Sequence, residues 1–306
     1  MAMRTLKLAE LTDPEIESLD RMSTIFAMAL SPLEVHGPHL PLGTDVMVSE
    51  ELLNRAISKM SEQRQDISFV LFPPYFLGSD TIPRSVDVDS RALNYFLKAS
   101  ADFLADRGFH YLLVIDNHGG PRHQLAIAKA VRSLYFNKQF HIIAPFLRFY
   151  RRMVEDDPDL LSQLQVKPGA CGDTDDIHAG LNETSLMLAL DETKVRTAWD
   201  GLARVTINRR RWPGLLLGFL AKIFNLIGAR ELASDIRHVG IMLCWVTEED
   251  ASTYIGEPRA ACKSSGDRML DAHADEAVEE MLAALAGKPP YFKPLGWSLR
   301  FLERSR

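Results

Sequence analysis

The sequence TIFAMALSPLEVHGPHLPLGTD, residues 24–45, joins a buried strand to a loop rich in chemically active side chains. Its first part, residues 24–30 (TIFAMAL), is a short continuous apolar run, which is typical of a strand covered on both faces of a parallel sheet. The following loop holds Glu34, His36 and Asp45 among prolines and glycines. Because ligands bind beyond the carboxyl ends of parallel strands, this stretch predicts both the kind of sheet and the position of the site.

Short apolar runs alternate with helical patterns along the rest of the chain. Further strands are predicted at residues 68–72, 111–116, 141–144 and 239–245. Helices are predicted at residues 46–60, 91–107, 124–135, 181–190 and 267–286, and residues 156–176 are predicted to be a loop with at most one helical turn. This alternation predicts an α/β fold with a mainly parallel central sheet and helices on both faces, a three-layer α/β/α arrangement.

The composition excludes some classes of protein. With 46% hydrophobic and 25% charged residues, the chain has the composition of an ordinary globular protein,. A net charge of −6 provides no basic field for phosphates, so we do not expect nucleic acid as a partner,. Three cysteines without C-x-x-C spacing, Cys171, Cys244 and Cys262, predict free thiols in a reducing compartment,. The polar N-terminus does not resemble a signal peptide, and we expect a cytoplasmic protein.

Residues 212–228 (WPGLLLGFLAKIFNLIG) are strongly apolar, with Lys222 as the only charge, and follow the basic run at residues 209–211. The segment is shorter than the roughly 20 residues that a membrane-spanning helix needs. One interpretation is a buried or oligomer-interface helix. The other is an interfacial membrane helix or a hydrophobic lid over a site. The sequence leaves both open.

Glu34 and His36 are two residues apart, so in an extended chain their side chains point the same way. The loop between His36 and Asp45 is rich in turn residues, among them Pro38, Pro41 and Gly43, and can bring Asp45 back to the same point,. A carboxylate has two oxygens, so Asp45 could bridge two metal ions. Nitrogen and oxygen ligands without sulfur suit zinc, manganese or iron.

His118 follows the predicted strand at 111–116 and precedes two glycines, which allow close approach to a ligand or metal,. A third polar cluster, residues 175–185 (DDIHAGLNETS), contains His178 and Glu183. A purely structural interpretation is also open here, with Asn182 as a helix N-cap and Glu183 favouring the helix dipole. His39 could simply support its loop. The remaining histidines are interpreted as structural: His110, His123, His141, His238 and His273.

Three of these stretches together resemble a known family. GPHLPLGTD, preceded by Glu34-Val35-His36, resembles the signature E-x-H-G-x-H-L-P-x-x-T-D of the creatininase (creatinine amidohydrolase) family. Residues 117–120 (NHGG) resemble its N-G-H-G-G-N element, and residues 176–185 (DIHAGLNETS) resemble its D-x-H-A-G-x-x-E-T-S element. Residues 256–258 (GEP) with Gly266 are similar to a late G-x-P…G stretch. These matches are collinear and span roughly residues 20–285.

The resemblance implies a layered α/β/α fold, a site with two divalent metal ions and hydrolysis of cyclic or linear amides. Zinc is the first expectation, with manganese or iron as alternatives. Members are often homohexamers, so we expect a homo-oligomer. The implied metal ligands, with Asp45 bridging, are Glu34, His36, Asp45 and His118. We expect a single domain over residues 1–306, with an apolar helical insertion at about 204–234 and a C-terminal tail at about 288–306.

The resemblance also assigns proton transfer to His178. Creatininase itself takes a further ligand from an acid two residues after the position of His118, where this chain has Gly120. Glu183 is the expected substitute, as a metal ligand with a part in catalysis. The resemblance thus adds two residues to the four that the spacing indicates.

The chain departs from the family pattern around the expected pocket. Asp116-Asn117 replaces N-G, Pro121 replaces the final asparagine, and residues 29–32 (ALSP) replace P-x-G-S. Residues 156–177 lack the aromatic side chains expected beside creatinine, which favours another amide, a formamide or a short peptide as the small-molecule substrate. The alternatives are a catalytically silent metal-binding member and a membrane-surface protein that uses residues 209–228.

Overall fold

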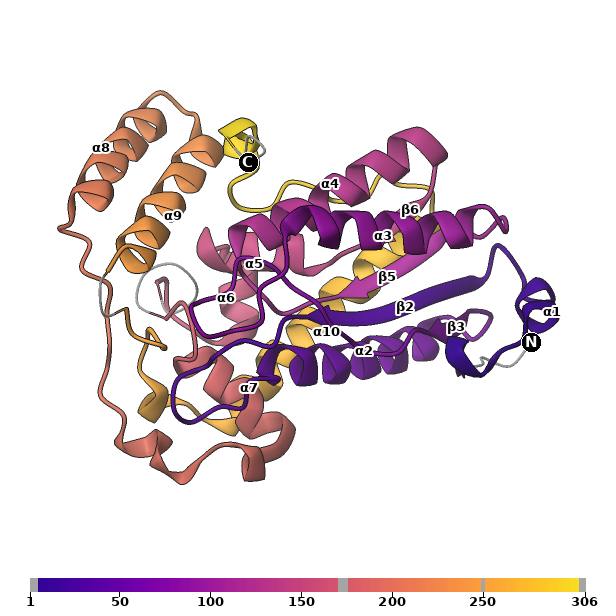
Figure 1. Cartoon of the computed structure of the whole chain (residues 1–306), viewed down its shortest axis with the longest axis horizontal. Helices are drawn as coiled ribbons and strands as arrows, with labels where there is room; N and C mark the ends of the chain where they lie inside the picture. Colours follow the sequence, from indigo (N-terminus) through magenta and orange to yellow (C-terminus); the bar gives the residue numbers. More distant parts are fainter. Residues whose placement is uncertain (1–4, 170–175, 249–250, 303–306) are drawn as a thin grey trace.

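The computed structural model describes residues 5–169, 176–248 and 251–302 (Figure 1). Its centre is a parallel sheet in the order β1-β3-β2-β5-β6, and β4 pairs with the end of β2. The strands are β1 (Thr5–Lys7), β2 (Thr24–Ser31), β3 (Ser68–Leu71), β4 (Tyr75–Phe76), β5 (Tyr111–Ile115) and β6 (His141–Ile143). Every residue of β2 is buried, as the unbroken apolar run predicts,.

Alternate residues of β2 enter two separate cores, because successive side chains of a strand point to opposite faces. Ile25 and Ala27 pack under α2 (Thr44–Gln63), α7 (Leu181–Asp191) and α10 (Lys263–Leu285). Phe26 and Met28 pack under α3 (Ser90–Ala105) and α4 (Pro121–Lys138). The helices therefore form a layer on each face of the sheet, which confirms the predicted α/β/α fold (Figure 1).

The shorter elements are two helices, α1 (Asp13–Glu17) and α5 (Phe146–Val154), and five 3-10 helices. The 3-10 helices are η1 (Leu8–Glu10), η2 (Glu192–Lys194), η3 (Thr197–Gly201), η4 (Pro258–Ala260) and η5 (Trp297–Leu302). The predicted loop at 156–176 contains one short helix, α6 (Pro158–Leu164), capped by Asp157. Residues 170–175 of that loop, with Cys171, lie outside the described residues.

The strand predicted at 239–245 is wrong, because these residues form the last turns of α9 (Arg230–Val246). A short apolar run does not distinguish a buried strand from a buried helix face. Here Gly240, Ile241, Cys244 and Trp245 are buried at helical spacing, and the run continues a helix that begins nine residues earlier, at Arg230. The helix uses this face against α8 (Trp212–Leu226) and the body of the protein.

α8 and α9 lie side by side as a hairpin at one end of the molecule (Figure 1). The interpretation of 212–228 as a buried helix is wrong for the single chain, because only Pro213 and Ala221 of α8 are buried. α9 covers one side of α8, and the other side faces solvent. In the described parts of the chain, no helix is long and apolar enough to cross a membrane.

A buried carboxylate fixes α9 to the body. Asp235 of α9 accepts hydrogen bonds from Arg151 of α5 at 2.5 Å and from the backbone N–H groups of Gly296 and Ser298, both at 2.9 Å. Asp235 and Arg151 are both buried. One side chain therefore joins α9, α5 and the C-terminal segment.

We predict that Asp235→Ala lowers the free energy of unfolding by about 3 kcal/mol, because it leaves the Arg151 guanidinium buried without its main partner. Urea unfolding monitored by circular dichroism measures the change. The matched control is Asp66→Ala, which removes an exposed ion pair with Arg64 and is expected to change stability little,. Equal losses in the two variants would contradict the role given to Asp235.

Candidate metal centre

The candidate centre lies beyond the carboxyl ends of β2 and β5. The loop after β2 folds back on itself through a hydrogen bond from the Glu34 N–H to the Leu42 carbonyl (2.9 Å), and Asp45 follows in the first turn of α2. One loop after β5 and one before α7 complete the cluster. The structure brings together all six side chains that the sequence singles out: Glu34, His36, Asp45, His118, His178 and Glu183.

Asp45 stands between two donor groups. Its Oδ2 lies 3.6 Å from His118 Nδ1, which is 3.0 Å from Glu34 Oε2. Its Oδ1 lies 3.4 Å from His36 Nε2, which is 3.6 Å from Glu183 Oε2. Two atoms that bind one zinc ion tetrahedrally at about 2.1 Å are roughly 3.4 Å apart. Each donor group therefore has the spacing of a metal site, and the two groups share one carboxylate.

Several polar atoms of this cluster are buried without a hydrogen-bond partner in the described part of the chain. They are Glu34 Oε2, His36 Nε2, Asp45 Oδ1 and Asp45 Oδ2. A buried polar atom without a partner costs about 1–3 kcal/mol, and more when it is charged. All four atoms point into one small space with an excess of negative charge. The residues present therefore fit a bound cation.

Backbone carbonyls fix the orientation of the two histidines. His36 Nδ1 donates to the carbonyl of Glu34 at 2.9 Å, and His118 Nε2 donates to the carbonyl of Ser79 at 3.1 Å. A carbonyl only accepts, so these nitrogens carry protons, and the opposite nitrogens, which face the carboxylates, are the ones that can bind a metal ion. Such outer contacts commonly hold metal-binding histidines in the required tautomer.

The carboxylates dominate the electrostatics of the cluster. Burial disfavours the charged form of His36, but Asp45 and Glu183 outweigh it and raise its pKa to about 10. Burial likewise opposes protonation of His118, and Glu34 and Asp45 raise its pKa well above the usual value. Without a metal, the centre therefore holds protons where cations would bind.

His178 lies at the edge of the cluster. Its Nε2 donates to the carbonyl of Val35 at 2.7 Å, so its Nδ1 carries a lone pair, 3.9 Å from Glu183 Oε2. The ring lies 4.4 Å from the His36 ring and 5.5 Å from Trp245 of α9, measured between centroids. His178 thus presents a proton acceptor to the centre while its other nitrogen is fixed.

The structure combines the two interpretations of the segment before α7. The Asp176 carboxylate caps the helix by accepting from the N–H groups of Leu181 (2.6 Å) and Asn182 (2.8 Å), so Asn182 is not the cap. Glu183 accepts from the Ala179 N–H and also faces His36. Ala179 has a positive φ of 48°, an uncommon conformation for a residue with a side chain,. The first turn of α7 is therefore capped by Asp176 and directs Glu183 toward the centre.

No side chain fits at position 120. A Cβ on Gly120 would lie 2.4 Å from His118 Nε2 and 2.9 Å from the Asp80 carbonyl oxygen. An acid at this position would have to displace the His118 ring. With His118 in this position, residue 120 must be glycine and cannot be the acid that creatininase is expected to have there. Glu183 is the acid that faces the centre instead.

Sequence analysis missed Asp116. Its carboxylate accepts from the backbone N–H of His118 at 2.9 Å and lies 3.3 Å from His123 Nε2. An acid at the end of a buried strand, two residues before a candidate ligand, was the available signal. His39 supports its loop, since its Nε2 is 2.8 Å from Thr184 Oγ1.

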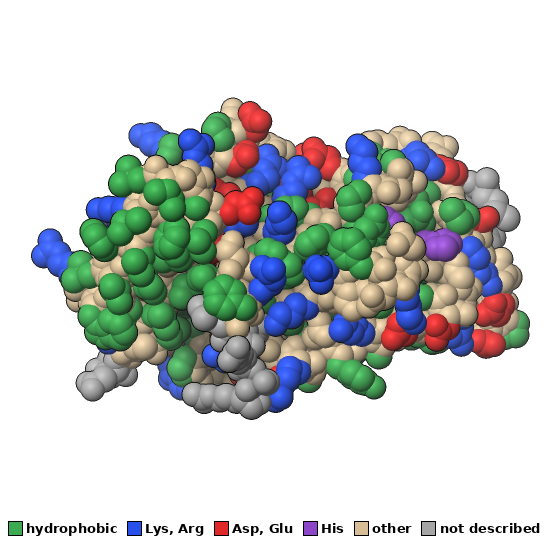
Figure 2. Space-filling view, turned by 90° about the horizontal axis from the view of Figure 1, so that it is seen from above, with side chains coloured by type: hydrophobic (Ala, Val, Ile, Leu, Met, Phe, Trp, Pro, Cys, Tyr) green, Lys and Arg blue, Asp and Glu red, His purple; other side chains and the backbone are tan. Residues whose placement is uncertain are grey.

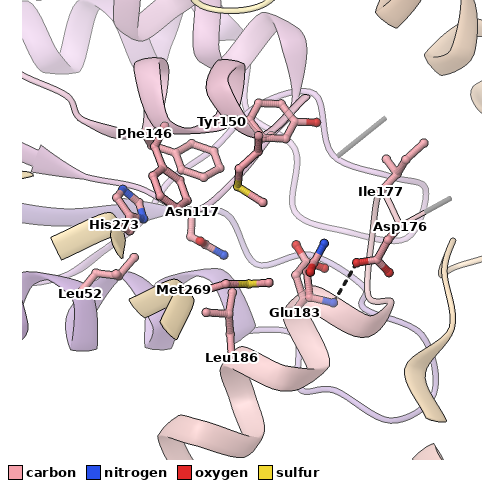
Figure 3. A pocket seen from close by; sticks show the side chains of 14 residues that line it. Leu52, Asn117, Phe146, Tyr150, Asp176, Ile177, Glu183, Leu186, Met269 and His273 are labelled. Carbon is pink, nitrogen blue, oxygen red and sulfur yellow. Dashed lines mark hydrogen bonds between the residues drawn. The ribbon is translucent and has the colours of Figure 1, made fainter. Parts of the chain in front are cut away.

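A pocket adjoins the centre, with Asn117 and Glu183 in its wall (Figure 3). Its apolar walls come mainly from α5, with contributions from α7 and α10: Phe146, Phe149, Tyr150, Met153, Leu186 and Met269. His273, expected to be structural, stacks on Phe149 at 4.6 Å and lines this wall. The aromatic residues missing from the 156–177 loop are thus supplied by α5, whose apolar residues recur at helical spacing.

We predict that Gly120→Ala displaces His118 and lowers both the bound metal and the thermal stability, with about 1–3 kcal/mol of strain. Elemental analysis and thermal unfolding measure the two effects. Gly201→Ala is the matched control, because nothing lies within 4 Å of a Cβ there. Normal metal content in the Gly120 variant would contradict this packing.

The chain was compared with known families and structures. The family model described as Creatininase (creatinine amidohydrolase) matches residues 9–281. A protein assigned as a creatinine amidohydrolase from Bacteroides fragilis has a TM-score of 0.61 and 17% identity, covering 92% of this chain and 96% of that one. A structure titled "Creatininase Mn" and a mutant creatininase of the Zn–Zn type each have a TM-score of 0.60 and 17% identity, covering 92% and 99%.

No curated protein sequence matches the chain. At this low identity, the structural likeness shows the shared fold. The family match spans most of the chain and includes all six residues of the candidate centre. The chain therefore belongs to the creatininase family of metal-dependent amidohydrolases.

Proposed function

We propose that this protein hydrolyses the C–N bond of a small amide at a centre that holds two divalent metal ions. The observation that carries the proposal is the position of Asp45, whose two oxygens face separate histidine–glutamate pairs. Glu34, Asp45 and His118 would hold one ion. His36, Asp45 and Glu183 would hold the other. A mononuclear centre would leave one of these buried groups without a cation.

The donor atoms are all nitrogen and oxygen, which suits zinc first and manganese or iron as alternatives. Divalent ions bound there would supply Lewis acidity, which would lower the pKa of a water molecule toward neutral pH and polarise the carbonyl of the amide. The protein holds the ligands in a buried space with their outer nitrogens fixed by backbone carbonyls. The ligand side chains are therefore in position before an ion or a substrate binds.

His178 is the proposed proton carrier. Its Nδ1 lone pair faces Glu183, while its Nε2 is held by Val35. A base in this position can take a proton near the centre and give it to the leaving nitrogen, the step that amide cleavage requires. A catalytically silent metal-binding protein would have no need of this free nitrogen.

The pocket supports a substrate with an apolar part beside its amide. Phe146, Tyr150 and Met269 form one wall, and Asn117 and Glu183 supply polar groups next to the centre (Figure 3). This lining favours an amide, a formamide or a short peptide over creatinine. A homo-oligomer, a hexamer by analogy with the family, and a cytoplasmic location are further proposals, the latter supported by the free thiols of Cys244 and Cys262.

We predict that protein purified without chelator binds two divalent ions per chain and hydrolyses a member of an amide, formamide and short-peptide panel. Glu34→Gln and Glu183→Gln are each expected to retain about one ion, because each removes a ligand from one group. Asp45→Asn is expected to lose both. Elemental analysis counts the ions, and His110→Asn, a histidine outside the cluster, serves as the control.

His178→Ala separates catalysis from metal binding. It is expected to keep both ions and to lose about 100-fold or more in turnover, the usual contribution of a positioned acid–base group. Full activity with fewer than two ions per chain would refute the dinuclear proposal. Two ions without turnover on any panel member would favour the silent alternative.

We predict that metal binding at about pH 7.5 releases at least about one proton per ion. The pKa of His36 is raised to about 10 and that of His118 is also raised, so both rings are protonated in the metal-free protein, whereas a ligand must be neutral,. Affinity therefore falls as the pH is lowered. Titration calorimetry in buffers of different ionisation enthalpy measures the release, and heats independent of the buffer would contradict it.

A further inference from the structure

The outer side of α8 is an uncovered apolar surface. Its side chains recur every three or four residues and so lie on one face of the helix: Trp212, Leu215, Leu216, Phe219, Ile223 and Leu226,. Trp212 is 74% exposed, Phe219 62% and Leu226 85%. We call these six residues the α8 apolar face. Figure 2 shows hydrophobic side chains gathered over this end of the molecule, with Lys and Arg side chains at its margin.

The contacts between α8 and α9 do not involve the α8 apolar face. The inner side of α8 buries Pro213 and Ala221, and Leu217 contacts α9 so closely that a Cβ on Gly240 would lie 2.9 Å from it. Arg211 further joins the start of α8 to the end of α9, by donating to the carbonyls of Cys244 (2.8 Å) and Thr247 (2.7 Å). The outer residues are therefore not needed to hold the helix in place. A contiguous exposed patch of this kind marks a contact with something outside the chain.

The segment that carries the face is basic. Residues 201–230 contain six basic residues and no acid, in a chain with net charge −6: Arg204, Arg209, Arg210, Arg211, Lys222 and Arg230. Lys222 is exposed on α8 itself, and Arg209 and Arg210 are exposed just before it. The partner must therefore offer both an apolar layer and negative charge.

A second copy of the chain fits this requirement poorly. A two-fold contact through the face would bring together two segments that hold six basic residues each and no acid, and like charges that meet in an interface are unfavourable,. An anionic lipid surface supplies an acyl layer for the apolar side chains and phosphates for the basic ones. Exposed tryptophan also favours the boundary between lipid and water.

We propose that the α8 apolar face docks on an anionic phospholipid membrane surface. α8 has 15 residues and lies along the surface, with Trp212 and Phe219 among the lipid chains and Lys222 among the headgroups. α9 connects this contact to the candidate centre, since Trp245 lies beside His178 and His238 lies 6.0 Å from the Tyr150 ring. The proposal stands whether or not the proposed hydrolysis is correct.

Flotation of the full-length protein tests the proposal. The vesicles are phosphatidylcholine alone and an equimolar mixture of phosphatidylcholine with phosphatidylglycerol. The wild-type protein is expected to float with the anionic vesicles and to be released by high salt. The double variant Trp212→Ser/Phe219→Ser is expected to lose at least about tenfold in bound fraction. Tyr95→Ser, which removes an aromatic side chain that is 75% exposed on α3, is the matched control and should bind as the wild type does.

A charge variant separates the two components of the surface. Lys222→Glu changes the charge by two, and each charge near the surface contributes about fivefold. It should therefore weaken binding to anionic vesicles roughly 25-fold and leave binding to neutral vesicles unchanged. Circular dichroism confirms that the variants are folded, and Leu226→Ser replaces the double variant if it is not. Absence of flotation by the wild type would overturn the proposal. So would a dimer that the double variant dissociates while vesicles bind neither protein, because the face would then meet a second copy.

Discussion

The burial of Asp45 between two histidines is the constraint on which the candidate centre depends. A carboxylate without solvent is unfavourable unless positive charge surrounds it. The first turn of α2 supplies part of that charge through the helix dipole, and His36 and His118 supply more on opposite sides of the same carboxylate,. With Glu34 and Glu183 added, three carboxylates share one buried space, and imidazoles in their neutral form carry no charge to balance them. Protons relieve this excess in the metal-free protein, and divalent ions would relieve it in the working enzyme.

The fold meets this constraint by ending two neighbouring strands at the same place. β2 and β5 pair in parallel, so the loops that follow them leave the same edge of the sheet,. The loop after β2 supplies Glu34 and His36, and the loop after β5 supplies His118. Asp116, the residue directly after β5, holds the second loop by accepting from the His118 N–H, so the support of the centre begins where the strand ends. The geometry of the candidate centre and the topology of the sheet are therefore determined together.

Much of the fold and of the centre could be predicted from the sequence, for local reasons. β2 is a continuous apolar run, and His36 and Glu34 follow it at a spacing that places them on one side. The strand predicted at 239–245 was wrong, because a run of seven residues is too short for its hydrophobic spacing to distinguish a strand from a helix. The support from Asp116 and the pocket wall from Phe146 depend on contacts across the sheet, which spacing does not encode. α8 was recognised as unusual, but its exposure is a property of packing against α9.

Anomalous scattering from crystals soaked with zinc or manganese tests the central claim most directly. The account predicts two peaks per chain that share Asp45, one beside Glu34 and His118 and the other beside His36 and Glu183. A single peak, or a second peak ligated by His178 in place of Asp45, would contradict it.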